Sequence, residues 1–321
     1  MNRKTVGAIS SYDNLGSFPA DWLWKQTPHP FGTWGNIQMN ARSSAPDFLL
    51  LYNFNVPKSP RKLTLREKLG LQKSPTDRVR ENWRKLPQLP PERVIYLLRE
   101  PPLAEVIDRH KAAYENAKPY CGHISGPDNF APQPNYMPAI WYASDSFREL
   151  DEMPPPIKQK PCSWISSGIN RTQNHRNRLA FMKQLKQSEV DVDLYGRNLP
   201  EWSVSCGPLA NKSYAMNPYR YNLAIENYAD NDWYVSEKLW DALLSWCLPI
   251  YYGGPAADKL LPPGSFLRLP SLDEKGIAYI REVTATPDAW YEAKEAIAEA
   301  RQIILHKLNL LNWLSDFVAK F

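Results

Sequence analysis

The stretch that most constrains the fold runs from Tyr219 to Gly254, and it reads as strand, polar loop, helix and strand. Tyr221–Ile225 is short, apolar and β-prone, and residues 227–232 after it have the composition of a turn. Ser236 is then placed to cap a helix. The apolar stripe of this helix, at helical spacing, consists of Leu239, Trp240, Leu243, Leu244 and Cys247.

The second half of the stretch returns the chain to the sheet. Pro249 should end the helix, and Ile250–Tyr252 should run as a buried strand into the Gly253–Gly254 turn. A strand–helix–strand unit with short links is a parallel crossover, and ligands of such folds bind outside the carboxyl ends of the strands. The polar residues expected at this edge are Glu226, Asn227, Glu237 and Lys238.

The same edge suits a phosphorylated ligand. A helix N-terminus offers unpaired backbone N–H groups and about half a unit of positive charge. Lys238, in the first turn, adds a full positive charge beside them, a layout that favours a diphosphate. The alternative is that Glu237 and Lys238 form an ordinary solvated helix start, and local chemistry alone does not choose between the two.

The stretch resembles the donor-binding motif of the α1,3/α1,4-fucosyltransferases, glycosyltransferase family 10, which transfer fucose from GDP-fucose. The resemblance rests on the blocks YNLAIEN, YVSEK and LPIYYGG in that order, followed by PPGSF at Pro262–Phe266. Ser236 stands where the family usually has Thr, and the loop before Tyr234 is one residue longer than expected. The resemblance implies an α/β fold of the GT-B type, with two Rossmann-like domains facing a cleft.

Length and composition agree with a two-domain protein. At 321 residues the chain is too long for one ordinary domain, and its 12 Trp and 17 Tyr indicate a folded, aromatic-rich protein. The net charge of +5 fits a nucleotide sugar or an anionic surface, but it is too weak to imply nucleic acid.

A stiff, polar segment at Pro154–Pro161 is the predicted linker. We therefore predict an acceptor-side domain over 1–157, a donor domain over 158–301 and a C-terminal helix over 302–321. The wide apolar face of that helix should dock back on the first domain, with a membrane surface as the alternative cover. The basic segment Lys58–Lys85 is read as a solvated helical face, with an anionic acceptor or membrane surface as the alternative.

The first domain should contain strands at Val6–Ser10, Phe48–Tyr52 and Arg93–Leu98. The aromatic loop Trp22–Trp34 is either part of an acceptor wall or ordinary packing.

A carboxylate follows the third of these strands. The family has a catalytic-base glutamate at a strand end of this kind, closely followed by proline, and Glu100 is the matching position. Glu105 is a competitor for this role, and a salt-bridged turn residue is the plain alternative.

Further donor-binding residues are implied by the resemblance. Arg178 lies three residues ahead of Phe181, which is the family's spacing for a diphosphate-binding arginine, and Arg176 could substitute for it. Lys212 matches a position that is often Lys, although an isolated lysine is more often a surface residue. The segment VDVDLYGRN contributes a strand that ends at Tyr195 and Gly196. The remaining implied donor contacts are the helix start at Ser236, sugar or ribose hydroxyls on Glu226 and Glu237, and a pocket lined by Asn227 and Tyr234.

Neither a metal nor another cofactor is expected. The four cysteines lack metal-ligand spacing, and Cys121 and His123 have no further ligands nearby in sequence. Arg178 and Lys238 would take the place of a metal at the leaving diphosphate. The N-terminal sequence has no signal-peptide core or membrane span, which predicts a cytosol-like location for a soluble bacterial-type member. A peripheral contact with the inner face of the membrane is the alternative.

The expected partners are GDP-fucose and a glycan acceptor, with transfer by inversion. The rival readings are a transferase for another nucleotide sugar and a non-catalytic protein that binds carbohydrate or anions. The acceptor, the linkage position and the oligomeric state are left open by the sequence.

Overall fold

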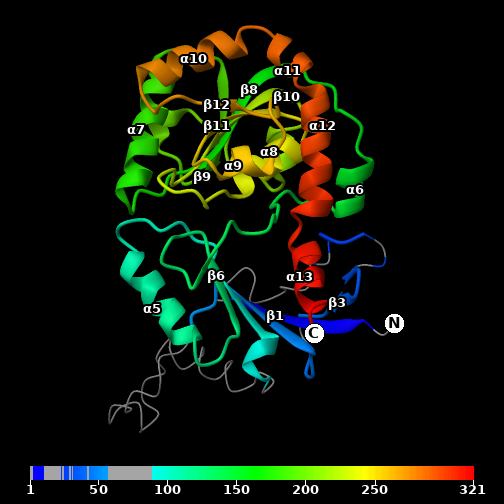
Figure 1. Ribbon diagram of the computed structural model, residues 1–321. Helices are drawn as coiled ribbons and strands as arrows, with labels where there is room; N and C mark the ends of the chain where they lie inside the picture. The colour runs from blue at the N-terminus through cyan, green and yellow to red at the C-terminus, as the bar shows by residue number, and fades with distance from the viewer. Residues whose placement is uncertain are drawn as a thin grey trace. The chain divides into compact units, whose positions relative to one another are not determined.

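The structure is a computed structural model, and it describes residues 3–10, 23, 25–28, 30, 32–41, 43–56 and 89–321. The basic segment Lys58–Lys85 and Trp22 in the aromatic loop lie outside the described residues. The chain divides into two compact units, one formed by Met1–Asn135 with Leu314–Phe321 and the other by Tyr136–Trp313. Each unit has its own sheet (Figure 1).

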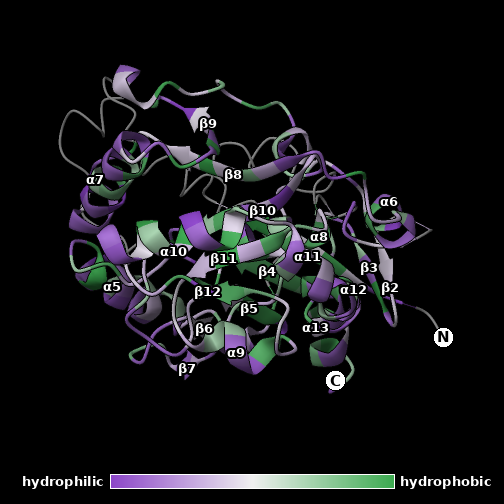
Figure 2. Cartoon of the chain, turned by 90° about the horizontal axis from the view of Figure 1, so that it is seen from above, coloured by the Kyte–Doolittle hydropathy of each residue, from purple (hydrophilic) through white to green (hydrophobic). Residues whose placement is uncertain are grey.

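The sheet of the first unit is almost entirely parallel. Its strands stand in the order β2-β3-β1-β4-β5-β6-β7, and among them only β2 and β3 are described as an antiparallel pair. The centre is formed by β4 and β5, every residue of which is buried. Both strands have the hydrophobic colour in Figure 2. The elements are β1 (Lys4–Ser10), β2 (Thr33–Trp34), β3 (Ile37–Met39), β4 (Phe48–Tyr52), η1 (Pro91–Arg93), β5 (Val94–Leu97), α5 (Ile107–Ala117), β6 (His123–Gly126) and β7 (Gln133–Pro134).

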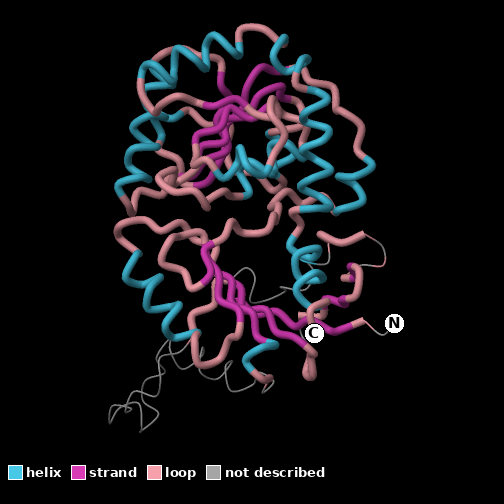
Figure 3. Tube along the Cα trace, viewed as in Figure 1, coloured by secondary structure: helices cyan, strands magenta, loops and turns pink. Residues whose placement is uncertain are grey.

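The second unit contains a parallel five-stranded sheet in the order β12-β11-β10-β8-β9 (Figure 3). Numbered from its own first strand, this is the doubly wound order 2-1-3-4-5, whose topological switch point lies between β8 and β10. The elements are α6 (Phe147–Glu152), β8 (Lys160–Ser167), α7 (Gln173–Gln187), β9 (Val192–Arg197), η2 (Glu201–Ser203), η3 (Lys212–Ala215), β10 (Tyr219–Ile225), α8 (Glu237–Leu244), β11 (Leu248–Tyr252), α9 (Ala256–Leu260), β12 (Leu267–Arg268), α10 (Glu274–Thr284), α11 (Asp288–Glu292) and α12 (Lys294–Gln302). The predicted α/β class is confirmed, with a mainly parallel, Rossmann-like sheet in each unit.

The strand–helix–strand stretch folds as expected, with one correction. Ser236 caps α8, and β10 pairs with β11 in parallel. The helix ends earlier than predicted, because Trp246 adopts a left-handed backbone conformation with φ of 60°. Cys247 is therefore buried outside the helix, and Pro249 lies inside β11. Proline is tolerated there because only Ile250 and Tyr251, after it, pair with the neighbouring β12.

The prediction of one continuous helix over 302–321 is wrong. The chain passes from α12 through a π-helical turn, Ile303–Lys307, and only then into α13 (Leu310–Val318). The break occurs where Ala139 forms a strand-like bridge with the buried Asn309. Because the Ala139 carbonyl accepts the N–H of Leu310, that N–H does not continue the helical ladder.

The last residues of the chain pack within the first unit. The rings of Phe317 and Phe321 lie 6.5 and 5.5 Å from that of Phe48, centroid to centroid. The domain limits drawn from the sequence, at 157/158 and 301/302, stay a prediction, and the compact units divide elsewhere. In the part of the chain that the structure describes, no helix is both long enough and apolar enough to cross a bilayer.

Candidate functional site

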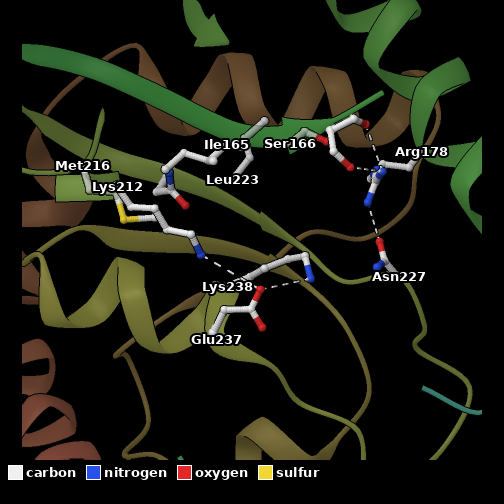
Figure 4. Close-up of a pocket in the computed structure, with 11 residues that line it drawn as sticks. Ile165, Ser166, Arg178, Lys212, Met216, Leu223, Asn227, Glu237 and Lys238 are labelled. Atoms are coloured by element: carbon white, nitrogen blue, oxygen red, sulfur yellow. Dashed lines mark hydrogen bonds and ion pairs between the residues drawn. The ribbon is translucent and has the colours of Figure 1, made fainter. Parts of the chain in front are cut away.

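A cavity of about 280 Å³ lies in the second unit, at the switch point between β8 and β10. Its wall is formed by the ends of these two strands and by side chains from α7, η3 and α8 (Figure 4). This is where a doubly wound sheet binds its ligand, because the links from neighbouring strands diverge there. The lining residues are Ile165, Ser166, Ser167, Arg178, Lys212, Met216, Asn222, Leu223, Asn227, Glu237 and Lys238.

Arg178 supplies a buried cation to this cavity. Its guanidinium donates through Nη1 to the side-chain oxygen of Asn227 and through Nη2 to the Ser167 carbonyl at 3.1 Å. The residue is only 4% exposed, and its buried Nε has no hydrogen-bond partner among the described residues. Burial lowers the pKa of this guanidinium, which a bound anion would counteract. An anion would also supply the missing acceptor.

The start of α8 supplies a second cation. Lys238 lies 3.3 Å from a carboxylate oxygen of the buried Glu226 and 3.2 Å from the Ser236 hydroxyl. Both carboxylate oxygens of Glu226 also accept bonds from Ser236, from its N–H at 2.7 Å and from its hydroxyl at 2.6 Å. Glu226 therefore holds the start of α8 in place, while Lys238 lines the cavity.

A third cation, Lys212, enters from η3. Its ammonium lies 2.5 Å from Asp241, a fully buried carboxylate on α8. Burial raises the pKa of the Asp241 carboxyl, and the Lys212 ammonium opposes that shift. Figure 4 shows Glu237 in contact with both lysines, at 4.0 Å from Lys212 and 3.9 Å from Lys238. The cavity is thus lined by three cationic side chains and one carboxylate.

Five of the donor-site residues expected from the sequence meet in this cavity: Arg178, Lys212, Asn227, Glu237 and Lys238. Arg176, the competitor of Arg178, is exposed and bonds to Gln173 on its own helix. Glu226 and Ser236 do not line the cavity and are hydrogen-bonded to each other.

Three further expected residues do not line the cavity. The Tyr195 hydroxyl is 2.7 Å from that of Tyr219. Gly196 has φ of 148° and lies so close to the Ser166 carbonyl that a side chain would clash, so it serves the packing of β9 on β8. Tyr234 is buried, with its ring 6.3 Å from that of Tyr228.

Sequence reasoning missed several residues of the site, of which Asn222 and Asp241 are the most telling. Asn222 is a polar residue inside the apolar run of β10, and its amide donates to Ser163 on β8 at 2.9 Å. Asp241 stands between buried apolar residues of α8. A polar side chain at a position that periodicity assigns to the core was the available signal for both.

The first unit contains Glu100, the residue predicted to be the base, near a strand end. Glu100 is exposed three residues after the end of β5, and the Arg99 N–H before it donates to the Asn53 side chain at 2.5 Å. The Arg99 guanidinium donates to the Tyr52 hydroxyl at 3.0 Å, which further fixes this turn. The competitor Glu105 is also exposed, so exposure does not separate the two carboxylates.

Possible metal ligands are scattered. Within the described ranges, no three His, Cys, Asp or Glu side chains gather closely enough to hold an ion. All four cysteines are free thiols, and burial raises the pKa of the Cys121 thiol to about 12. The expectation that no metal is needed stays a prediction.

A cationic cavity at the switch point of a doubly wound sheet is typical of α/β proteins that bind anionic, phosphate-bearing ligands. Comparison with known proteins narrows this class. Residues 155–292 match the family model described as glycosyltransferase family 10 (fucosyltransferase) C-term. Through this region, the chain is similar to that glycosyltransferase family.

Two curated relatives are fucosyltransferases, and this chain matches each of them over part of its length. Alpha-(1,3)-fucosyltransferase C of Drosophila melanogaster is 32% identical over 137 residues, which are 41% of this chain and 30% of the relative. Alpha-(1,3)-fucosyltransferase FucT of Helicobacter pylori is 32% identical over 84 residues, 26% of this chain and 17% of the relative. A crystal structure of an alpha1,3-fucosyltransferase with GDP covers 99% of this chain and 91% of its own, at 17% identity and a TM-score of 0.46. The match thus spans less than a third of the length of these curated relatives.

Proposed function

We propose that this protein transfers L-fucose from GDP-fucose to a hydroxyl group of a glycan acceptor, with inversion at the anomeric carbon. The observation that carries the proposal is the buried Arg178, whose Nε lacks a partner in a cavity that Lys212 and Lys238 also line. A diphosphate has the charge and the acceptor oxygens to bind the Arg178 guanidinium and to interact with both lysines. The family of residues 155–292 supports fucose as the sugar that is transferred.

The chemistry follows from where charge develops. As the bond between the sugar and the β-phosphate breaks, negative charge accumulates on the departing GDP. Arg178, Lys238 and the backbone N–H groups at the start of α8 are the donors placed to stabilise it, without a metal ion. Each fixed donor of this kind is worth roughly 3 kcal/mol in comparable oxyanion sites. The Glu237 carboxylate would accept hydrogen bonds from hydroxyls of the donor, and Asn227 would line its pocket.

The acceptor must lose a proton as its oxygen attacks. Glu100, exposed at the carboxyl end of β5, is the proposed general base. The proton passes from the acceptor hydroxyl to this carboxylate, the new bond forms at the anomeric carbon, and GDP leaves from the opposite face. General-base assistance of this kind accelerates a reaction about a hundred- to ten-thousand-fold.

Titration calorimetry with a panel of donors tests the proposal. GDP and GDP-fucose should bind more tightly than GDP-mannose or UDP-sugars, and GDP-fucose should be consumed when a suitable glycan acceptor is added. Tighter binding and turnover of another nucleotide sugar would assign the enzyme to that donor. Glycan binding without affinity for any nucleotide sugar would indicate a non-catalytic carbohydrate-binding protein instead.

A further inference from the structure

Tyr142 stands out in a segment that is otherwise closed to solvent. All other residues of 137–143 are buried, whereas Tyr142 is 36% exposed. A large aromatic side chain that remains accessible on a buried backbone leaves apolar surface in water, which a ligand would cover. Tyr142 belongs to the second unit, as does the donor cavity.

The backbone of Tyr142 is anchored to the elements that form the cavity. One oxygen of the buried Asp241 accepts the N–H of Tyr142 at 2.8 Å and that of Ala143 at 3.3 Å. The next residue, Ser144, donates its N–H to the Asn211 side chain at 3.2 Å, just before η3. These bonds fix the backbone of three consecutive residues, and with it the point from which the Tyr142 side chain extends.

The ring also contacts a side chain of the cavity wall. The ammonium nitrogen of Lys212 lies 5.5 Å from the centroid of the Tyr142 ring. The same lysine lines the cavity and pairs with Asp241, the anchor of the Tyr142 backbone. An exposed aromatic face therefore lies one side chain away from the proposed diphosphate site, although Tyr142 itself is not in the cavity wall.

We propose that Tyr142 is a stacking platform for a pyranose ring of the substrate. The C–H bonds of a sugar would pack on the aromatic face, and the phenolic hydroxyl could bond to a sugar hydroxyl. The ring that stacks could belong to the donor or to the acceptor, since the chemistry is the same. The proposal rests on the proposed function only for the identity of these sugars.

Two variants separate sugar stacking from a role in the diphosphate site. Tyr142→Leu removes the aromatic face, and Tyr142→Phe keeps it. Tyr142→Leu should weaken a sugar-bearing ligand about three- to tenfold, while GDP affinity stays within about twofold. Tyr142→Phe should stay within about threefold of the wild type for every ligand. Tyr214→Leu, at another exposed tyrosine in η3, is the matched control and should change neither affinity.

The ligands identify the source of the sugar. A loss of GDP-fucose affinity relative to GDP would place the donor sugar on Tyr142, and a higher KM for the acceptor alone would place the acceptor sugar there. Unchanged affinity of Tyr142→Leu for every sugar-bearing ligand would overturn the proposal. An equal loss of GDP affinity would also overturn it, because the ring would then serve to hold Lys212.

Failure of the proposed function has a different signature. It would appear in the wild type, as absence of binding to both GDP and GDP-fucose. Direct binding of neutral oligosaccharides would still test the platform in that case, since Tyr142→Leu should lose this binding and Tyr142→Phe should keep it. Oligosaccharide binding that is equal in both variants, or absent from the wild type as well, would overturn the platform independently.

Discussion

Replacing Glu226 by Gln should destabilise the second unit much more than the removal of a surface charge would. Glu226 is 3% exposed, and its two oxygens accept from the Ser236 N–H, the Ser236 hydroxyl and the Lys238 ammonium. Glutamine keeps one acceptor oxygen for the N–H. Its amide nitrogen, however, faces the hydroxyl and the ammonium, where the carboxylate had accepted both bonds.

The magnitude follows from these contacts. Losing a hydrogen bond to a charged group costs about 1.5–3 kcal/mol, and breaking a fully buried ion pair costs about 3–5 kcal/mol. The side chain of Lys238 is 21% exposed, so water relieves part of the cost on its side. We expect the free energy of unfolding to fall by about 2–4 kcal/mol. For a unit of this size, that lowers Tm by roughly 5–12 °C.

Differential scanning calorimetry of Glu226→Gln and Glu237→Gln checks this reasoning. Glu237→Gln is the same substitution at the same helix start, but the ion pairs of Glu237 are 3.9 and 4.0 Å long and its side chain is 21% exposed. It should therefore lose less than about 1 kcal/mol. A Glu226→Gln protein with the Tm of the wild type but weaker GDP-fucose binding would refute the argument. Glu226 would then be a sugar-binding residue, as the family resemblance implied.

Four further outcomes are expected. Lys238→Met should weaken GDP binding by at least about tenfold in calorimetry, because a charge-assisted phosphate contact is lost. Lys259→Met, on the exposed surface, is the control and should not weaken it. Equal GDP affinities of the two variants would remove Lys238 from the diphosphate site. Glu100→Gln should bind GDP-fucose normally yet transfer fucose at least about a hundredfold more slowly, whereas normal turnover would move the base elsewhere. Burial lowers the pKa of His123 from 6.5 to about 4, so the unfolded chain binds the proton first, and His123 should cost up to about 3 kcal/mol of stability in urea titrations as the pH drops from about 6.5 to 4. His123→Gln should reduce the pH dependence of stability without removing it, because burial lowers the pKa of His110 in the same way, and an unchanged slope would contradict the assignment. Leu314→Ala should lower the free energy of unfolding by about 2–5 kcal/mol, because this side chain is fully buried. An unchanged Tm, together with reduced pelleting on anionic vesicles, would instead indicate that a membrane covers the apolar face of the C-terminal helix.

The sequence by itself determined the local elements of the donor unit. The apolar run of β10, the cap at Ser236 and the helical stripe of α8 are encoded by neighbouring residues, so periodicity and capping chemistry find them. The same locality allowed the motif blocks to indicate the family. It also placed Asn227, Glu237 and Lys238 at the ligand edge, because a crossover puts strand ends and helix starts together.

Only the tertiary structure decided where individual polar side chains point. Lys212 and Asp241 are 29 residues apart, and their ion pair depends on η3 lying against α8. The break before α13 depends in the same way on Ala139, which pairs with Asn309. Glu226 faces Ser236, and Tyr195 faces Tyr219, because a buried polar group takes whichever partner packing brings to it. In these two pairs the partner is 10 and 24 residues away in the chain, and neither spacing nor propensity identifies it.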